Sequence, residues 1–342
     1  MTNAAADAER ALSTARKHGD PDALAEALAA HANTLVQTGQ LTKARDEIDE
    51  VAAIHRERGR HGDEARYSML AATVSRLSGD LEGAKERATR ALDLVPSGSD
   101  VAAAATSELV DVALAQQRPD EAASLTERVL ASATTGLAAS VRASLLRKRA
   151  AALASMGRVA EAVTDLTDAL TQLQQAGEGA AARRAMVELA TLLQQSNVEA
   201  AERVRENAMA DAREANDQAV VADLRLLETT AAVTRGDVDG ALAAAREARD
   251  AALAGVSPVA YTSAVATISR LADTQGDRVG AYEALAVGWV TLRDLMGDAL
   301  ARRTFEPALL ALRSRWGETA FDAVKAEYEA RRRSELSRSG SR

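Results

Sequence analysis

Two glycine–acid strings are the first candidates for chemistry in this chain. They are GDLEGA at Gly79–Ala84 and GDVDGA at Gly236–Ala241. A glycine followed by an acid occurs in loops that bind phosphate or metal ions, and also in turns between helices. A phosphate loop would need a Gly-x-x-x-x-Gly-Lys-Ser/Thr pattern or a strand directly before the glycines, and the sequence predicts neither. The two acids are far apart in the chain and belong to separate repeats, so we do not expect them to bind one metal ion together.

The other reactive side chains form no catalytic or metal-binding pattern. Without cysteine, the chain has no thiol nucleophile and no cysteine-bound zinc. Its four histidines include no His-Glu-x-x-His pair. We expect His31 to be a hydrogen-bonded packing residue, and His55 and His61 to be solvated. The acids between residues 46 and 50 are typical of the solvated side of an amphipathic helix. The sequence therefore predicts no catalytic residue, no metal site, no cofactor and no enzymatic activity.

Composition predicts helices and argues against two classes of partner. The chain has 342 residues, of which 47% are apolar but only 2% aromatic, so its core must be built from Ala, Leu and Val. Alanine is the best helix former, and five prolines leave long stretches unbroken. A net charge of -8 argues against binding to nucleic acid or to an anionic membrane. Because there is no apolar run of about 18 residues and no leader-like N-terminus, we expect a cytoplasmic protein.

The Gly-x-x-x-x-Ala frame of the opening strings recurs along the chain at intervals of 38 to 40 residues. An apolar stripe with helical spacing follows each alanine, and a second one precedes each glycine, so each repeat is a helical hairpin. The glycine suits the left-handed residue that ends the first helix, the acid can cap the second, and the small alanine lets the two helices touch. The alanines of the seven repeats are Ala44, Ala84, Ala122, Ala162, Ala201, Ala241 and Ala281.

These features resemble the tetratricopeptide repeat, in a long-period bacterial form whose unit is nearer 40 residues than the usual 34. The excess of 37 arginines over 5 lysines also suggests a GC-rich bacterial genome. The resemblance implies an all-α fold, a right-handed α-solenoid of stacked antiparallel hairpins with a C-terminal helical cap. The expected divisions are an N-terminal half repeat at 1–20, seven hairpins at 21–300, capping helices at 301–335 and a basic disordered tail at 336–342.

The resemblance implies that the chain is a non-catalytic scaffold or adaptor. Its concave groove, lined by the first helix of each hairpin, would bind a segment of another protein or a peptide. The alternative is a regulatory sensor arm that binds a peptide or small ligand and controls a separate effector. The groove positions carried over from the repeat frame are Asn33, Gln37, Arg66, Met69, Thr73, Arg76, Ser107, Asp111, Arg147, Arg183, Met186, Leu226, Thr230, Arg270 and Asp273.

Two regions depart from the regular pattern. In the fifth repeat, Ser196 replaces the turn glycine and Arg205 falls on the apolar stripe, which indicates either ordinary divergence or a functional bend. At the C-terminus, we expect one long helix to run from residue 282 to 303, and Pro307 to open a short helix that Gly317 stops. The aromatic residues gathered in this last quarter either fill a thicker terminal core or form a docking or homodimer patch. The patch residues would be Trp289, Trp316 and Tyr328.

Overall fold

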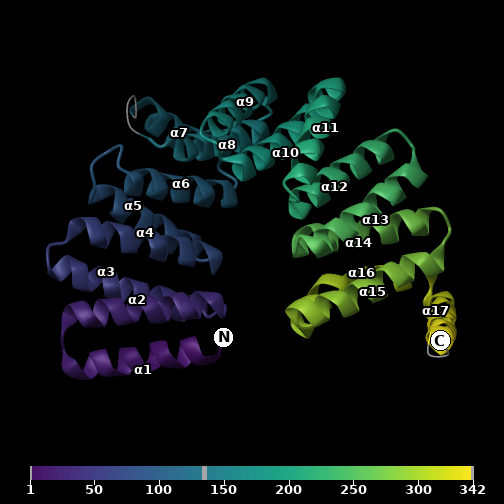
Figure 1. Cartoon of the computed structure of the whole chain (residues 1–342), viewed down its shortest axis with the longest axis horizontal. Coiled ribbons are helices and arrows are strands. Elements are labelled where there is room, and N and C mark those ends of the chain that lie inside the picture. The colour runs from purple at the N-terminus through teal and green to yellow at the C-terminus, as the bar shows by residue number, and fades with distance from the viewer. Residues whose placement is uncertain (1, 133–136, 340–342) are drawn as a thin grey trace. The chain divides into compact units, whose positions relative to one another are not determined.

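The computed structural model describes residues 2–132 and 137–339, which form 17 α-helices and no strand (Figure 1). The chain divides into two compact units, Met1–Ala185 and Met186–Arg342, and consecutive helices pack side by side between residues 2 and 175 and between residues 198 and 339. The all-α solenoid expected from the sequence is therefore confirmed. None of the helices in these residues is long and apolar enough to cross a membrane.

The first unit begins with a single helix, α1 (Thr2–His18), and continues with antiparallel hairpins. The first helices of neighbouring hairpins also pack against each other, as α4 (His61–Leu77) does with α6 (Asp100–Ala115) and α6 does with α8 (Ala139–Ser155). A further helix, α10 (Gly179–Ser196), begins in this unit and extends into the second. The hairpins are α2 (Pro21–Gln37) with α3 (Leu41–Glu57), α4 (His61–Leu77) with α5 (Leu81–Asp93), α6 (Asp100–Ala115) with α7 (Pro119–Ser132), and α8 (Ala139–Ser155) with α9 (Val159–Gln175).

The second unit continues the same alternation and ends in two further helices. The terminal helix packs against the last hairpin and against the helix that precedes it. The helices are α11 (Val198–Glu214), α12 (Gln218–Thr234), α13 (Val238–Ala254), α14 (Pro258–Thr274), α15 (Arg278–Met296), α16 (Asp298–Trp316) and α17 (Glu318–Ser339). Because α17 ends at Ser339, it includes the first four residues of the segment predicted as a tail, and residues 340–342 lie outside the described residues.

The glycine–acid strings are turns between helices. Gly79 and Gly236 have φ angles of 88° and 76°, the left-handed region that favours glycine. The next residue caps the following helix: the Asp80 carboxylate accepts a hydrogen bond from the backbone N–H of Gly83 at 3.0 Å. Asp237 caps α13 in the same way. The predicted role of both residues in the turn is confirmed.

The repeat alanine is the fourth residue of the second helix in every hairpin, and it is buried in all seven. Its methyl group lies where the two helices of the hairpin meet. In the first hairpin, Ala44 belongs to a core cluster with Ala32 and Leu35 of α2 and Ala71 of α4. A larger side chain at this position would force the helices apart, which explains why the sequence keeps alanine there.

The turn between the two helices of the fifth repeat has a different structure from the glycine turns described above. Ser196 is the last residue of α10, and Asn197, with φ at -153°, caps α11 by accepting a hydrogen bond from the N–H of Ala200 at 3.0 Å. No left-handed residue is used there. Arg205 is largely buried and pairs with Glu202 on its own helix and with Glu228 of α12 at 3.1 Å. The arginine on the apolar stripe is thus accommodated by acids.

The predicted helix boundaries near the C-terminus are wrong. The expected long helix from residue 282 to 303 is broken at Gly297, whose φ of 94° ends α15 at Met296 and starts α16. Pro307 does not open a helix but lies inside α16. A glycine in the left-handed region stops a helix outright, whereas one proline removes a single N–H donor that a packed helix can forgo. Gly317, with φ at 84°, ends α16 as predicted.

Candidate functional site

A groove between α2 and α4 combines apolar surface with polar side chains at its edge. Its volume is about 490 Å³. Among the groove positions predicted from the sequence, it contains Asn33, Arg66 and Thr73, whereas Gln37 and Met69 do not line it. We call it the α2–α4 groove. Its lining residues are Ala29, Ala32, Asn33, Val36, Ile48, Arg66, Tyr67, Leu70, Thr73, Val74 and Leu77.

Leucine side chains give the α2–α4 groove its apolar character. Leu70 and Leu77 are 40% and 55% exposed, although large aliphatic side chains usually lie in the core. They are seven residues apart on α4, two helical turns, and so lie on the same face. Ala32 and Val74 are buried beside them. The groove therefore offers apolar surface that no part of the described chain covers.

Polar groups flank this apolar surface. The Asn33 side chain is exposed on α2, and no described residue forms a hydrogen bond with its amide. On α4, the Arg66 guanidinium lies 5.1 Å from the centre of the Tyr67 ring and 3.4 Å from the Asp63 carboxylate. Both contacts are at the surface, where such interactions are weak. Asn33 can therefore bind a peptide backbone group, and Arg66 can bind an acid.

Tyr67 also packs against a buried histidine. The His55 ring stacks on the Tyr67 ring, with 5.3 Å between the centres and an angle of 8° between the planes. His55 is buried, so its predicted place at the solvated surface is wrong. Its position on the inner face of α3 opposite α4 explains the difference, because a large ring there fills space between helices. His31, by contrast, bonds the Glu47 carboxylate at 2.8 Å, as expected of a packing histidine.

Several predicted groove residues bind one another across the hairpins instead of facing a partner. The Arg76 guanidinium donates to the Glu108 carboxylate at 2.5 Å, and the Thr73 hydroxyl donates to the same group at 3.0 Å. Arg76 also lies 3.7 Å from Asp111, which accepts a hydrogen bond from the Lys148 ammonium at 2.7 Å. These five residues form an ion-pair chain that links α4, α6 and α8.

The ion-pair chain corrects the prediction for this part of the first unit. Arg76 and Asp111 already pair within the chain, and the Ser107 carbonyl accepts a second hydrogen bond from Lys148 at 3.0 Å. The repeat frame predicted Arg147 as a groove residue and did not identify Lys148, the next residue, which belongs to the ion-pair chain. Glu108 was also missed, because a buried acid on a first helix is visible in the sequence only as one more charge on an amphipathic helix.

The predicted groove positions in the rest of the chain are not gathered into a described pocket. Arg147 and Arg183 are half-buried, and both have interactions within the chain. Met186 is buried, so its predicted role as an adaptable contact for a partner is wrong. The helical register turns its side chain toward the core. In the second unit, Thr230 and Arg270 are exposed and Leu226 is half-buried.

At the C-terminus, a predicted groove residue binds a predicted docking residue. The indole N–H of Trp316 donates to the Asp273 carboxylate at 2.7 Å, and Arg315 pairs with the same acid. Asp273 is therefore not available to a partner. Tyr328 is buried against Val279, so it does not belong to an exposed patch. Trp289 and Trp316 are half-buried.

The aromatic rings of this region pack into the terminal core, the first of the two readings left open by the sequence. The ring of Tyr282 on α15 meets the rings of Phe321 and Tyr328 on α17 edge to face, each with 5.5 Å between centres. Such pairs stabilise beyond the area they bury. The aromatic residues thus attach α17 to the last hairpin.

Comparison with known proteins defines the fold. No protein-family model matches the chain, and no curated protein matches it. Among solved structures, aspartyl phosphate phosphatase F from Bacillus subtilis superposes with a TM-score of 0.60 at 9% identity, over 84% of this chain and 75% of that one. The apo form of RapI gives 0.59 at 11% identity, over 83% of this chain and 99% of that one.

A Rap protein complexed with Competence and Sporulation Factor gives a TM-score of 0.55 at 12% identity, over 80% of this chain and 76% of that one. At these identities the likeness is one of fold. The chain has the fold of tetratricopeptide-repeat proteins, and the resemblance read from its turns and alanines is confirmed at that level.

Proposed function

We propose that this chain is a protein-interaction scaffold that holds a segment of a partner protein in the α2–α4 groove. The observation that carries the proposal is the pair of exposed leucines, Leu70 and Leu77, in a hollow edged by Asn33 and Arg66. An apolar groove with a few polar groups at its rim is the usual form of a peptide-binding site. Binding covers the leucines and removes apolar surface from water.

The chemistry of the groove defines the partner segment. Aliphatic or aromatic side chains fill the hollow beside Leu70 and Leu77. An acidic side chain pairs with Arg66, and the Asn33 amide bonds a backbone group of the segment. Thr73 lies between the two leucines on α4 and already donates to the buried Glu108, so the segment does not need to displace buried charges. We therefore place partner choice in the first two hairpins.

The test is selection of peptides from a random phage-displayed library on the immobilised protein. We expect enriched peptides with paired apolar residues and a nearby acid. Leu77→Glu should weaken their binding by at least tenfold, since it puts a charge into the apolar hollow. Leu310→Glu on α16 is the matched control, because Leu310 is 56% exposed against 55% for Leu77 and lies outside the groove. Equal binding to both variants, or no enrichment, would reject the proposal.

A regulatory sensor that controls a separate effector is the second candidate. It is favoured by the solved Rap protein of the same fold, which is complexed with Competence and Sporulation Factor. A sensor must change shape when its ligand binds, whereas an adaptor need not. Small-angle scattering with and without a selected peptide separates the two: compaction supports the sensor, and an unchanged profile supports the adaptor.

A further inference from the structure

An apolar patch lies in the second unit where α13 and α15 end, beside the first turn of α14. Five large aliphatic side chains there are exposed, by 46% to 81%. Isolated exposed aliphatic residues are common, but a group of five at one place is typical of an interaction surface. We call this group the α13–α15 patch. Its residues are Leu253, Val256, Val259, Leu295 and Met296.

The patch contains a hollow and, next to it, a projecting side chain. The hollow lies between the ends of α13 and α15 and has a volume of about 100 Å³. The buried side chains of Tyr261 and Leu292 line it together with every patch residue except Val259. Val259 is 81% exposed on the first turn of α14. The same surface thus offers a cavity for an aliphatic side chain and an aliphatic side chain that can fill one.

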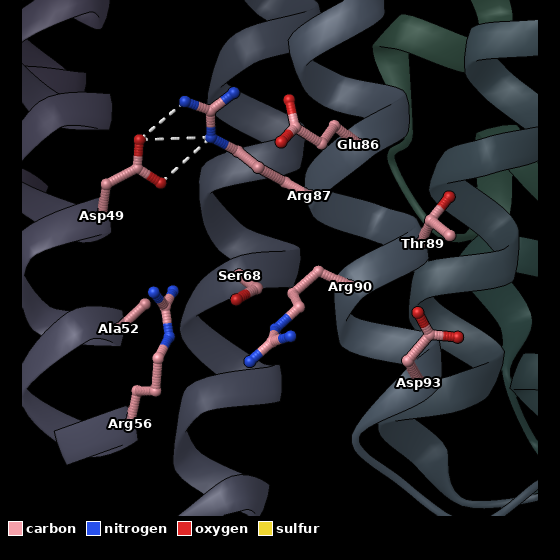
Figure 2. Close-up of a pocket in the computed structure, with 9 residues that line it drawn as sticks. All are labelled: Asp49, Ala52, Arg56, Ser68, Glu86, Arg87, Thr89, Arg90 and Asp93. Atoms are coloured by element: carbon pink, nitrogen blue, oxygen red, sulfur yellow. Dashed lines mark hydrogen bonds and ion pairs between the residues drawn. The ribbon is translucent and has the colours of Figure 1, made fainter.

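The corresponding groove of the first unit, between α3 and α5 and over α4, is polar (Figure 2). Arg87 and Asp49 form an ion pair of 2.7 Å across it. Arg56, which has the same place in its repeat as Leu253, donates to the buried Glu64 at 2.9 Å. A groove between two second helices therefore folds with charged walls. Folding alone does not explain the aliphatic walls of the α13–α15 patch.

The repeats allow three patch positions to be compared with their counterparts. Counted from the repeat alanine, Leu253, Val256 and Val259 are the twelfth, fifteenth and eighteenth residues. In the first, fourth and fifth repeats these positions hold only polar residues, glycine or alanine, and in no repeat but the sixth are all three aliphatic. The counterparts are Arg56, Gln174 and Arg213 for the first position, Gly59, Gly177 and Asn216 for the second, and Gly62, Ala180 and Ala219 for the third.

Val256 occupies a backbone conformation that does not suit it. Its φ is 51°, in the left-handed region, where its counterparts Gly59, Gly177 and Asn216 also lie. Glycine and asparagine tolerate this conformation, whereas it strains a β-branched residue. The Val256 side chain is 78% exposed, so burial within the chain offsets little of that strain. Strain at an exposed apolar residue indicates a contact outside the chain.

The charges beside the patch indicate what makes that contact. Arg249 and Asp250 on α13 form an ion pair of 2.7 Å, and Arg293 and Asp294 on α15 form one of 2.9 Å. Each pair lies within one helical turn of a patch residue. The two pairs carry no net charge, so they do not attract a strongly acidic or basic partner. A second copy of the chain presents the same two pairs and can place each arginine opposite an aspartate.

We propose that the α13–α15 patch is the interface between two copies of this chain. Val259 of one copy enters the hollow of the other, beside Leu295, and the two-fold symmetry of such a dimer repeats the contact in reverse. The exposed aliphatic side chains of both copies are then removed from water together. The patch and the α2–α4 groove share no residue, so this proposal does not depend on the proposed peptide binding.

Sedimentation equilibrium of the full chain between about 1 and 200 μM tests the proposal, because this range covers weak and moderate association. We expect the mass to rise from one chain to two, with no larger species. Leu253→Arg introduces the residue that the first and fifth repeats carry, and should weaken dimerisation by at least about tenfold. Leu310→Arg on α16 is the control, because Leu310 is 56% exposed outside the patch and the variant should dimerise like the wild type.

Val256→Gly separates the loss of the interface from a folding defect. The change removes an apolar contact and should weaken dimerisation by about threefold to tenfold. It also relieves the strained turn, so the melting temperature of the dilute, monomeric protein should rise. A folding defect would lower that melting temperature. Weaker association together with a more stable monomer therefore supports the proposal, and wild-type association in Val256→Gly contradicts it.

Crosslinking tests the contact directly, since the chain has no cysteine of its own. Chains carrying Val259→Cys are mixed with chains carrying Leu295→Cys and oxidised mildly. We expect the mixed disulfide to form faster than in a mixture of Val259→Cys with Leu310→Cys chains. The proposal is overturned by a wild-type chain that stays monomeric up to about 200 μM, by equal weakening in Leu253→Arg and Leu310→Arg, or by equal crosslinking in the two mixtures.

Discussion

The indole N–H of Trp316 donates a hydrogen bond to Asp273 at 2.7 Å and so ties the end of α16 to the end of α14. Asp273 is almost fully buried at this contact. A buried carboxylate that loses one of its donors is left partly unsatisfied, which costs more than the bond itself contributes. The pair is therefore a structural link of the terminal cap.

Trp316→Phe removes this donor while keeping an aromatic ring. We expect the free energy of unfolding to fall by about 1 to 3 kcal/mol, the cost of a buried acceptor left without its partner. Urea denaturation followed by circular dichroism measures it. Trp289→Phe is the control, because Trp289 is half-buried and no hydrogen bond from its indole is among the described contacts. Unchanged stability in Trp316→Phe would mean that this bond is not a structural link, and Trp316 would again be a candidate docking residue.

Arg76→Met should destabilise the first unit through Glu108. The change keeps the aliphatic stem but leaves the buried Glu108 carboxylate with Thr73 as its remaining donor. We expect a loss of about 3 kcal/mol in the free energy of unfolding, typical of breaking a buried pair. Arg66→Met on the same helix removes two surface contacts, with the Asp63 carboxylate and the Tyr67 ring, and should cost less than about 1 kcal/mol. Similar losses in both would mean that the ion-pair chain adds nothing.

We expect Glu64 to make the free energy of unfolding depend on pH in the acidic range. Burial alone would raise the pKa of its carboxyl, but hydrogen bonds from Arg90 and Arg56 hold this pKa below its usual range. The unfolded chain then binds the proton more readily. The stabilisation is therefore present above about pH 4.3, the unfolded value, and is lost as pH falls through the lower folded value.

Melting curves of wild type and Glu64→Gln between pH 3 and 7 measure this effect. At pH 7 we expect the variant to be less stable by about 2 kcal/mol, with the gap closing as the pH falls below about 4. Glu86→Gln removes an equal charge from an exposed position on α5 and should show no comparable loss at pH 7. A gap that stays constant across this range would contradict the assignment.

Val256→Gly should stabilise the protein. Val256 has a φ of 51°, in the left-handed region that costs a non-glycine residue about 1 to 2 kcal/mol, and it is 78% exposed. Glycine adopts this conformation without strain, so we expect a gain of about 1 kcal/mol by urea denaturation. Val259→Gly is the matched control: Val259 is 81% exposed but lies in the first turn of α14 with an ordinary helical conformation, so glycine relieves no strain there and should not stabilise.

The repeat frame and its turns could be predicted because they rest on local chemistry. A glycine before the turn, an acid after it and an alanine three residues beyond the helix start all act within one hairpin. The structure of the turn is therefore determined by residues that are close in sequence, as Gly79, Asp80 and Ala84 show. The same holds for Gly317, which ends a helix by its own conformation.

The partners of the first-helix residues could not be predicted, because they are set by the next hairpin. Arg76 and Lys148 lie 72 residues apart, yet both reach Asp111. A shift of one residue turns a helical side chain by about 100°, which is why the frame pointed to Arg147 in place of its neighbour. The boundary at Gly297 was missed because Pro307 is the stronger helix breaker by type, and only the packed structure shows which one ends the helix.

Contacts within each unit join helices that are consecutive or separated by one other helix. Loops closed by such contacts are short, so each hairpin can form with little loss of chain entropy and can open without opening its distant neighbours. Amide hydrogen exchange should then fall into a gradient, fastest at α1 and α17 and slowest in the middle of each unit. A destabilising substitution in one hairpin likewise affects mainly that hairpin. The segment around Leu70 and Leu77 can therefore vary in sequence while the rest of the chain keeps its fold.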